Sequence, residues 1–381
     1  MRLGVLGPDR RLDRRSGLIC GIDAATLPAM THDAALVDRA LAEARDLVRE
    51  ELSRLVVRRR RTGYGPLYDL LVDYPLREGK GLRPAICLSA ARAVGGRTDQ
   101  ALLSATALEL LHNGFLVHDD IEDGSVFRRG TSTLVASHGV PVAINVGDAT
   151  NVTAVSILLE NVAAIGVRKA LLVLREFERM ARESVEGQAI ELDWIGSGRF
   201  DLGDRDYVRM AYKKTCWYTV IAPMRIGVIC GSPPGLGAPS EAELASLVRL
   251  GFYAGIAFQV QDDLLNLAAD EGLYGKETEG DLWEGKRTVM LLHFVRTADP
   301  AARQRALALL RRPRPGKDPD EVGWLLAAMH AQGSLDHGRA VARRYSRRAL
   351  EIEATAFPRG MDENSRAFLR EMLNYVIDRV K

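Results

Sequence analysis

Two short acidic clusters stand at the ends of apolar stretches with helical spacing. The first is DDIED at residues 119–123, and the second is DDLLN at residues 262–266. Carboxylates four residues apart on a helix repel each other, which costs a few tenths of a kcal/mol. A divalent cation relieves that repulsion, and Mg²⁺ prefers one or two carboxylates together with water and substrate phosphates. One such cluster alone is typical of a solvated helix end, but two can face each other across a helical bundle and bind a polyanion through several metal ions.

The residues that precede the first cluster extend the same helical face. At 100° per residue, the side chains of four residues fall within about 60° of one another, and Asp120 lies beside them. The four are His112, Leu116, Asp119 and Asp123. The face therefore combines a histidine, an apolar side chain and two carboxylates one turn apart.

Basic groups alternate with the acidic clusters along the chain. They are GKGLRP at 79–84, RRG at 128–130, KKT at 213–215, GK at 275–276 and GKRT at 285–288. Glycine lets the backbone approach an anion closely, and a helix N-terminus adds positive potential. Any one of these groups is typical of ordinary surface charge. Acidic clusters that bind metal and basic groups that bind phosphate are together what a diphosphate substrate requires.

The elements that must position these residues are helices. Helical periodicity predicts helices at 34–60, 82–94, 100–118, 141–164, 168–194, 204–230, 240–269, 283–297, 301–311, 320–331, 336–356 and 361–379. Glycine- and proline-rich breaks predict loops at 79–81, 124–141, 232–235, 272–285 and 311–316. Strand-like alternation and hairpin turns do not occur together, so we expect an all-α fold. The motifs extend from 79 to 288 without a dividing linker, which favours a single domain at 33–381.

Composition excludes several classes of protein. The 52 basic and 50 acidic residues nearly cancel, so no overall field attracts nucleic acid. No apolar run reaches the ~18 residues of a transmembrane helix. The four scattered cysteines have no metal-ligand spacing, which favours reduced thiols in a cytoplasmic protein. Residues 1–32 lack the apolar run of a signal peptide, and we expect a disordered leader there rather than a targeting segment.

Taken in order, the motifs resemble those of the trans-isoprenyl diphosphate synthases. The resemblance rests on GKGLRP, ELLHNGFLVHDDIED at 109–123, RRG, KKT, and FQVQDDLLN at 258–266 followed by DLWEGKRT at 281–288. Within that family, the chain looks most like the geranylgeranyl diphosphate synthases of fungi and animals, which also tend to have DDxxN at the second cluster. The resemblance implies a bundle of about ten or more helices around a deep apolar cavity, and a homodimer.

The resemblance also implies a role for each matching residue. The diphosphate of isopentenyl diphosphate would be held by Lys80, Arg83, His112 and Arg129. The allylic diphosphate would be contacted by Arg128, Lys214, Thr215, Gln259, Lys276 and Lys286. About three Mg²⁺ ions would be bound, directly or through water, by Asp119, Asp120, Asp123, Asp262, Asp263 and Asn266. The five aspartates and Lys214 form the implied catalytic set.

The sequence departs from the family pattern at one position and is informative at two more. Asn266 replaces the last aspartate of the second cluster, which predicts somewhat weaker metal binding without loss of activity. Gly114 and Phe115 precede Asp119 by about one helical turn, in the neighbourhood that shapes the pocket floor in this family. The ring of Phe115 would stop a growing chain at about fifteen to twenty carbons, with twenty preferred; ordinary core packing is the alternative role.

The implied reaction joins an allylic diphosphate to isopentenyl diphosphate, head to tail, with a trans double bond and release of diphosphate. The product would be geranylgeranyl diphosphate, with farnesyl diphosphate or a longer chain as the other options. A class I terpene cyclase shares the aspartate-rich helix, but no N-x-x-x-S-x-x-x-E motif follows residue 190. A non-catalytic subunit of a heteromeric synthase would tend to lack the first cluster, which is intact here.

Overall fold

Helices dominate the part of the chain that the structure describes. The computed structural model describes residues 34–77, 79–233, 239–268, 279–356 and 362–378, so residues 1–32 and Lys276 lie outside it. Its longer helices are α1 (Ala34–Thr62), α4 (Leu82–Ala93), α5 (Thr98–Glu122), α7 (Val140–Gly196), α8 (Asp204–Ala211), α9 (Ala222–Gly231), α10 (Glu241–Ala268), α13 (Val289–Thr297), α14 (Pro300–Leu310), α15 (Pro319–Ala331), α16 (Ser334–Ala356) and α17 (Glu363–Asp378). Shorter elements are α2 (Gly65–Leu71), α3 (Asp73–Leu76), α6 (Leu134–His138), α12 (Gly280–Glu284), the π-helical segment η1 (Tyr212–Ile221) and the 3₁₀ turn η2 (Arg314–Gly316). The prediction of an all-α fold is confirmed.

One short hairpin corrects the expectation that residues 124–141 form only a loop. Strands β1 (Phe127–Arg128) and β2 (Thr131–Ser132) pair antiparallel, and α6 follows them. The turn between the strands has positive φ at both Arg129 (52°) and Gly130 (75°). Two successive positive φ values are the requirement of a tight hairpin turn, which usually has Asn or Asp in the first place. Because arginine stands in that place, the sequence pattern did not indicate the turn.

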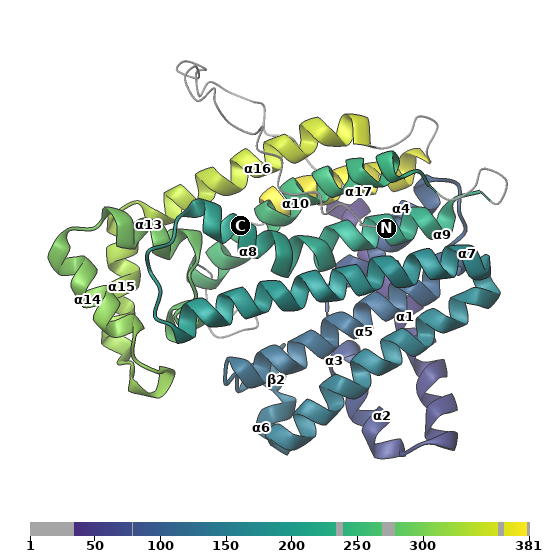
Figure 1. Ribbon diagram of the computed structural model, residues 1–381, viewed down its shortest axis with the longest axis horizontal. Coiled ribbons are helices and arrows are strands. Elements are labelled where there is room, and N and C mark those ends of the chain that lie inside the picture. The colour runs from purple at the N-terminus through teal and green to yellow at the C-terminus, as the bar shows by residue number, and fades with distance from the viewer. Residues whose placement is uncertain (1–33, 78, 234–238, 269–278, 357–361, 379–381) are drawn as a thin grey trace, which may run out of the picture. The chain divides into compact units, whose positions relative to one another are not determined.

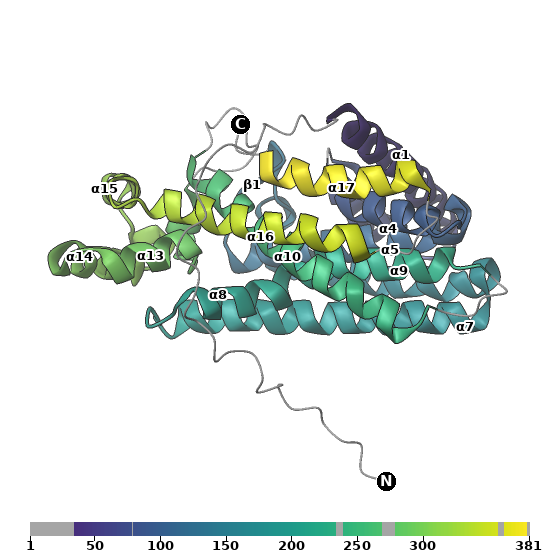
Figure 2. The same cartoon turned by 90° about the horizontal axis from the view of Figure 1, so that it is seen from above.

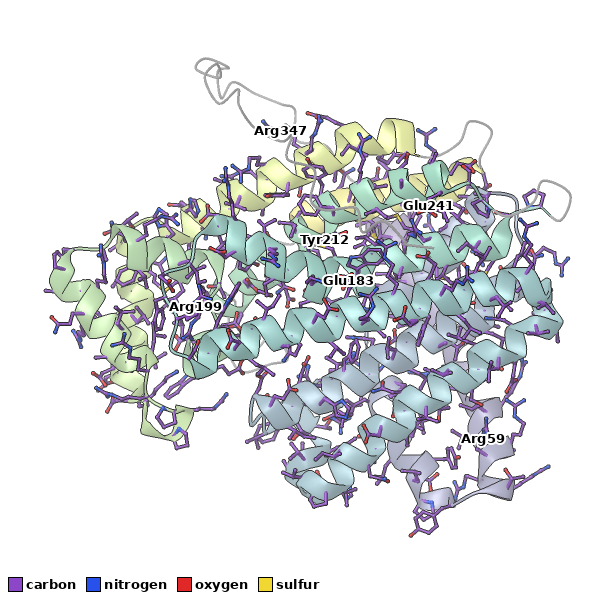
Figure 3. All side chains as sticks on the ribbon, in the orientation of Figure 1. Arg59, Glu183, Arg199, Tyr212, Glu241 and Arg347 are labelled. Carbon is purple, nitrogen blue, oxygen red and sulfur yellow. The ribbon has the colours of Figure 1, made fainter. Side chains whose placement is uncertain are left out.

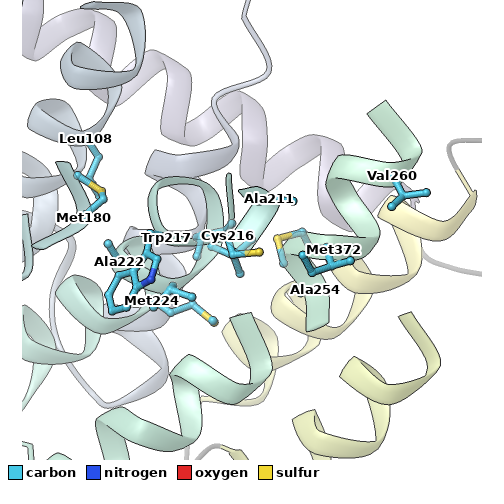
Figure 4. Packing of buried hydrophobic residues seen from close by; sticks show 14 of the residues in the cluster. Leu108, Met180, Ala211, Cys216, Trp217, Ala222, Met224, Ala254, Val260 and Met372 are labelled. Carbon is cyan, nitrogen blue, oxygen red and sulfur yellow. The ribbon is translucent and has the colours of Figure 1, made fainter. Parts of the chain in front are cut away.

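Two pairs of long helices form the frame around the site. Helix α5 packs along α7 and against α4, while α10 packs along α16 and η1. Figures 1 and 2 both show α7 lying alongside α5. Apolar side chains of these helices form one large buried cluster. Figure 4 shows part of this cluster, where Trp217 of η1 lies beside Met224 of α9. A rigid packed core of this kind holds the helix ends in fixed places.

The boundaries of two predicted helices differ in ways that matter for the site. The stretch predicted at 204–230 is α8, η1 and α9 in succession, with the π-helical segment in its middle. The stretch predicted at 283–297 is interrupted at 285–288, and α13 begins only at Val289, where the Thr288 hydroxyl caps the backbone N–H of Leu291. Helix α7 spans the two helices predicted at 141–164 and 168–194, and its kink at Gly166, which has a φ of 78°, lies at the predicted break. Helices α2 and α3 are too short to give a periodic pattern, and the sequence did not predict them.

Two further expectations from the sequence concern the cysteines and membrane-spanning helices. Cys87, Cys216 and Cys230 are buried free thiols. None of the helices in the described ranges combines the length and apolarity needed to cross a membrane.

Candidate active site

A cavity of about 710 Å³ lies where the ends of α5 and α10 meet η1 and the segment after α10. Most of the predicted site residues line it. They are Lys80, Arg83, His112, Asp119, Asp123, Arg128, Arg129, Lys214, Thr215, Gln259, Asp262, Asp263, Asn266 and Lys286. Residues 79 to 286 of the sequence therefore contribute acidic and basic side chains to one space. Asp120, Gly114 and Phe115 are not among the lining residues.

The first acidic cluster lies on the last turn of α5. Helix α5 continues to Glu122, so Asp119 is helical, and Asp123 is the residue that ends the helix. Both side chains line the cavity together with His112 and Leu116, the other members of the predicted face. Burial raises the pKa of Asp119, while Lys214 opposes the rise and Asp123 adds to it. A carboxylate in this state is stabilised by any cation that enters the cavity.

Asp120 occupies a different place from its neighbours. Its side chain is fully buried, with 0% exposed. Arg128 of β1 donates to both of its carboxylate oxygens at 2.6–2.8 Å, and the Tyr74 hydroxyl donates at 2.5 Å. Burial lowers the pKa of Arg128, but the hydrogen bonds and charge of Asp120 outweigh it and raise the pKa overall. Asp120 thus fixes Arg128 on the cavity wall rather than facing the cavity itself.

The second acidic cluster lies near the end of α10 and is held by hydrogen bonds. The Tyr207 hydroxyl donates to Asp263 at 2.7 Å, and the Gln259 amide donates to its other oxygen at 2.7 Å. Gln259 in turn accepts from the hydroxyl of Thr215. Burial raises the pKa of Asp263 to about 7, against these hydrogen bonds, and Asp262 adds to the rise.

Asn266 has a structural contact that the sequence did not indicate. Its side-chain oxygen accepts from the backbone N–H of Asp281 at 3.0 Å, and its backbone carbonyl accepts from Glu279 at 2.9 Å. The oxygen that was expected to bind metal therefore anchors the segment after α10. Asp281, at the start of that segment, lines the cavity and adds a carboxylate to this wall. Burial raises its pKa well above the usual range, with Lys286 opposing.

Lys286 connects the two acidic walls. Its ammonium lies 3.3 Å from Asp123 on the first wall, and 2.6 Å from Glu284 and 3.7 Å from Asp281 on the second. One cation is thus shared by carboxylates from α5 and from the α12 segment. The donors around the Lys286 ammonium are hard carboxylate oxygens, and they already accommodate one positive charge. Because Mg²⁺ prefers oxygen ligands, the residues of this site fit a divalent cation. Within the described residues, no group of three or more histidine, cysteine, aspartate or glutamate side chains could hold a metal ion by itself.

The basic wall opposite is built around the hairpin and the start of α4. Arg129 donates to the carbonyl of Tyr74 at 3.0 Å, and its guanidinium lies against Gly79, where a Cβ would come within 2.9 Å. Glycine at 79 therefore leaves room for the guanidinium in this position. Arg83 lies over the ring of Tyr218, 4.2 Å from its centre, and donates to the Thr219 hydroxyl at 3.0 Å.

The π-helical segment η1 contributes to both walls. It places Lys214 and Thr215 on the side of the second acidic cluster, and Tyr218 and Thr219 beside Arg83. A π-helical turn inside a helix is frequent at functional sites. Lys214 forms an ion pair with Glu191 of α7. The close approach of η1 to α7 depends on Gly187, where a Cβ would lie 2.2 Å from the backbone nitrogen of Lys214.

The two predicted chain-length residues lie behind the cavity wall. A Cβ on Gly114 would come 2.4 Å from the side-chain oxygen of Asn151 on α7. Gly114 thus permits the close α5–α7 contact. The Phe115 ring packs edge-on against Tyr218, with ring centres 6.0 Å apart, and Tyr218 itself lines the cavity.

Several site residues were missed by the sequence reasoning. They are Tyr74, Glu191, Tyr207, Tyr218 and Asp281. Asp281 had a usable signal, because it begins the stretch that also contains Lys286. Tyr218 lies three residues after the KKT motif, in η1. Tyr74, Glu191 and Tyr207 are single residues without a neighbouring motif, and only the packing of α3, α7 and α8 brings them to the site.

Comparisons with known proteins agree with this geometry. A family model described as polyprenyl synthetase matches residues 66–329. The chain is 32% identical to the short chain isoprenyl diphosphate synthase of Methanothermobacter thermautotrophicus, over 72% of this chain and 79% of that one. It is also 32% identical to the octaprenyl diphosphate synthase of Escherichia coli, over 71% of this chain and 78% of that one. The crystal structure of geranylgeranyl pyrophosphate synthetase from Pyrococcus horikoshii superposes with a TM-score of 0.76 at 30% identity, covering 90% of this chain and 98% of that one.

Proposed function

The chain belongs to the polyprenyl synthetase family and is a prenyltransferase, and we propose that it condenses an allylic diphosphate with isopentenyl diphosphate. The bond forms head to tail with a trans double bond, and diphosphate is released. The observation that supports this reaction is the single cavity in which two acidic clusters face two groups of basic side chains. Two diphosphates and the cations between them require that combination of charges.

We assign isopentenyl diphosphate to the wall formed by the hairpin and the start of α4. Lys80, Arg83, His112 and Arg129 surround that end of the cavity. Arg83 is fixed by Tyr218 and Thr219, so its guanidinium is ordered before a ligand arrives. Preorganised donors of this kind lose little freedom on binding.

The allylic diphosphate belongs on the opposite side. Its contacts would be Arg128, Lys214, Thr215, Gln259 and Lys286, with Lys276 as a further predicted contact outside the described residues. Mg²⁺ ions, about three by resemblance, would be held by Asp119, Asp123, Asp262 and Asp263. Asp120 would act through Arg128, and Asp281 is an added candidate ligand. When bound, Mg²⁺ neutralises charge on the departing diphosphate and so favours ionisation of the allylic C–O bond.

The protein's own residues direct the remaining steps. Lys214, Lys286 and Arg128 stabilise the leaving diphosphate electrostatically. Leu116, Tyr218 and Phe258 supply apolar surface in the cavity, which keeps water from capturing the allylic cation. Arg83 and Arg129 orient isopentenyl diphosphate so that its double bond meets that cation. The released diphosphate takes the proton that is lost as the new alkene forms.

Product length follows from the wall behind the cavity. Similarity does not decide it, because the chain is equally identical to a short-chain and to an octaprenyl enzyme. The geranylgeranyl length is the one that the family resemblance implies, and the edge-on contact of Phe115 with the cavity-lining Tyr218 supports an indirect role of Phe115 in setting it. Phe115→Ala should lengthen the product by one or more five-carbon units, since the ring no longer supports Tyr218. Gly114 acts indirectly, through the α5–α7 contact.

A homodimer is supported by an exposed apolar stripe on α7. Val152, Val155, Leu159 and Val162 recur at three- and four-residue spacing, and Val152 is 70% exposed. Such a stripe on one helix face is typical of a partner surface. Sedimentation of the purified protein, compared with Leu159→Asp, tests the assignment.

Product analysis by mass spectrometry tests the proposed reaction. The enzyme is incubated with Mg²⁺, each allylic diphosphate primer, and either isopentenyl diphosphate or no second substrate. We expect a lengthened prenyl diphosphate only when both substrates are present. A cyclic hydrocarbon formed from the allylic substrate alone would contradict the proposal and favour a terpene cyclase.

A further inference from the structure

The segment 280–288 is short but contains several charged residues of the site. It begins with the five-residue helix α12 (Gly280–Glu284) and contains Asp281 and Lys286, which line the cavity. Lys286 pairs with Glu284 of the same segment and with Asp123 on the other wall. The last carbonyls of any helix lack partners within the helix. In so short a helix, most of the carbonyls belong to that group. The segment therefore depends on contacts from elsewhere in the chain.

Lys317 supplies such a contact from outside the cavity. It follows η2 in the turn between α14 and α15, and only 8% of it is exposed. Its ammonium donates to the carbonyl of Leu282 at 3.0 Å and to that of Trp283 at 2.5 Å. Two of the open carbonyls at the C-terminal end of α12 are thereby satisfied by one positive charge, which also suits the negative end of the helix.

Other contacts fix the remaining parts of the segment. Asn266 accepts from the backbone of Asp281 at the start of α12. Gly285, with a φ of 76°, ends the helix and lies close to Lys317. Arg287 donates to the carbonyls of Trp194 and Arg199 at 3.0 and 2.9 Å. Arg199, labelled in Figure 3, lies in the connection between α7 and α8. Lys317 thus completes a frame of three anchors around the catalytic segment.

We propose that Lys317 is a positioning residue, which holds the end of α12 so that Asp281 and Lys286 meet the allylic diphosphate and its cations. The effect of Lys317 on catalysis rests on the proposed function, whereas its contact with the end of α12 does not. Lys317 is not among the residues that line the cavity. It acts on the substrate only through the backbone of α12.

The expected effect is selective for one substrate. Without the Lys317 ammonium, two buried carbonyls lose their donor, and the end of α12 opens more often. Lys286 then spends less time near Asp123, so the allylic side of the cavity weakens. Arg83 is held by Tyr218 and Thr219, and Arg129 by the carbonyl of Tyr74, so we expect the basic wall to remain as it is. A general loss of packing would not produce this selectivity between the two substrates.

Lys317→Met and Lys317→Arg form the main pair of variants. Methionine keeps the length of the side chain without a donor, whereas arginine keeps the donors and the charge. Arg312→Gln is the matched control, because Arg312 belongs to the same turn but pairs with Glu321 on the surface at 2.5 Å. Lys317→Gln serves if the methionine variant does not fold, since its shorter amide reaches fewer carbonyls while keeping the site polar.

Steady-state kinetics and amide hydrogen exchange decide the matter together. Lys317→Met should raise the KM for the allylic diphosphate and the Mg²⁺ half-saturation about tenfold, as loss of charge-assisted hydrogen bonds predicts. The KM for isopentenyl diphosphate should stay within about twofold, Lys317→Arg should recover most of the loss, and Arg312→Gln should match the wild type. Lys317→Gln should change in the same direction by a smaller factor.

Hydrogen exchange separates this inference from the proposed function. Amides at 282–288 should exchange faster in Lys317→Met than in Arg312→Gln, whatever the substrate. If the exchange changes as expected but the allylic KM does not, the substrate assignment of that wall is wrong. Unchanged exchange, or an equal rise of both KM values, would overturn the role of Lys317.

Discussion

The two acidic walls of the cavity begin with the same residue pair but balance their charge differently. Each has one aspartate held by a tyrosine, Asp120 by Tyr74 and Asp263 by Tyr207. On the first wall, Arg128 adds a bidentate ion pair to Asp120. On the second wall, no ion pair to Asp263 occurs within the described residues, and burial raises its pKa to about 7.

The difference lies between an aspartate whose charge Arg128 already balances and a group of carboxylates whose charges are balanced only in part. The Asp120–Arg128 pair neutralises itself and costs little as long as both partners are present. The second wall brings Asp262, Asp263 and Asp281 together, and their mutual repulsion can be relieved only by protons or by cations. We infer that metal binding changes the second wall more than the first.

Removing a carboxylate that faces the cavity should have the largest effect. Asp119→Ala and Asp262→Ala should each lower kcat by roughly a thousandfold or more, since charge stabilisation of the leaving group is the main source of rate. Folding stability should hold or rise, because a repelling buried charge is removed from the free protein. Turnover assays and thermal melting, with and without Mg²⁺ and diphosphate, measure the two effects. Near-normal turnover in both variants would refute the metal assignment.

The second comparison concerns the supports behind the walls. Arg128→Met leaves Asp120 buried without its cation and should lower the free energy of unfolding by about 3–5 kcal/mol. Tyr207→Phe removes one hydrogen bond to Asp263 and should cost about 1–3 kcal/mol. Urea unfolding gives both values. Equal costs would show that the two walls do not differ in the way described.

The sequence predicted the cavity far better than it predicted these supports. Motif spacing and resemblance identified the residues that line the wall, because each motif is a short run of residues that can be recognised in the sequence by itself. Asp120 shows the limit: the DDxxD pattern cannot distinguish an aspartate that faces the cavity from one that Arg128 holds in the core. The β1–β2 turn and the tether role of Asn266 depend on contacts between distant segments, which helical periodicity does not encode. The family resemblance indicated the roles of the site residues, whereas only the packing of the helices shows which side chains hold them in place.

The raised pKa of Asp263 predicts a pH dependence of the metal-free protein. Its ordinary pKa is 3.8 and its folded value is about 7, so between these values the folded protein binds more protons at this group than the unfolded chain does. Stability contributed by this group therefore falls as pH rises from about 4 to 7. Urea unfolding of the wild type and Asp263→Asn across that range should show a steeper fall in the wild type. Saturating Mg²⁺ and diphosphate should remove the difference; parallel curves in the free proteins would contradict the assigned charge state.

The smallest effect is expected at Asn266, where the two walls differ in sequence as well as in structure. Asn266→Asp keeps an oxygen that can accept from the backbone N–H of Asp281, so the tether to α12 should survive. The new carboxylate adds charge beside Asp262 and Asp263, which costs more in the free protein than the few tenths of a kcal/mol of a pair on an exposed helix, because position 266 is buried. The same charge strengthens cation binding. We expect the Mg²⁺ half-saturation to fall by about twofold to fivefold, with kcat nearly unchanged. Asn266→Ala removes the tether without adding charge and should instead raise the half-saturation and speed hydrogen exchange at 280–288. If aspartate and alanine shift the Mg²⁺ requirement in the same direction, position 266 acts only as a tether, and the charge of the second wall is set by its other carboxylates.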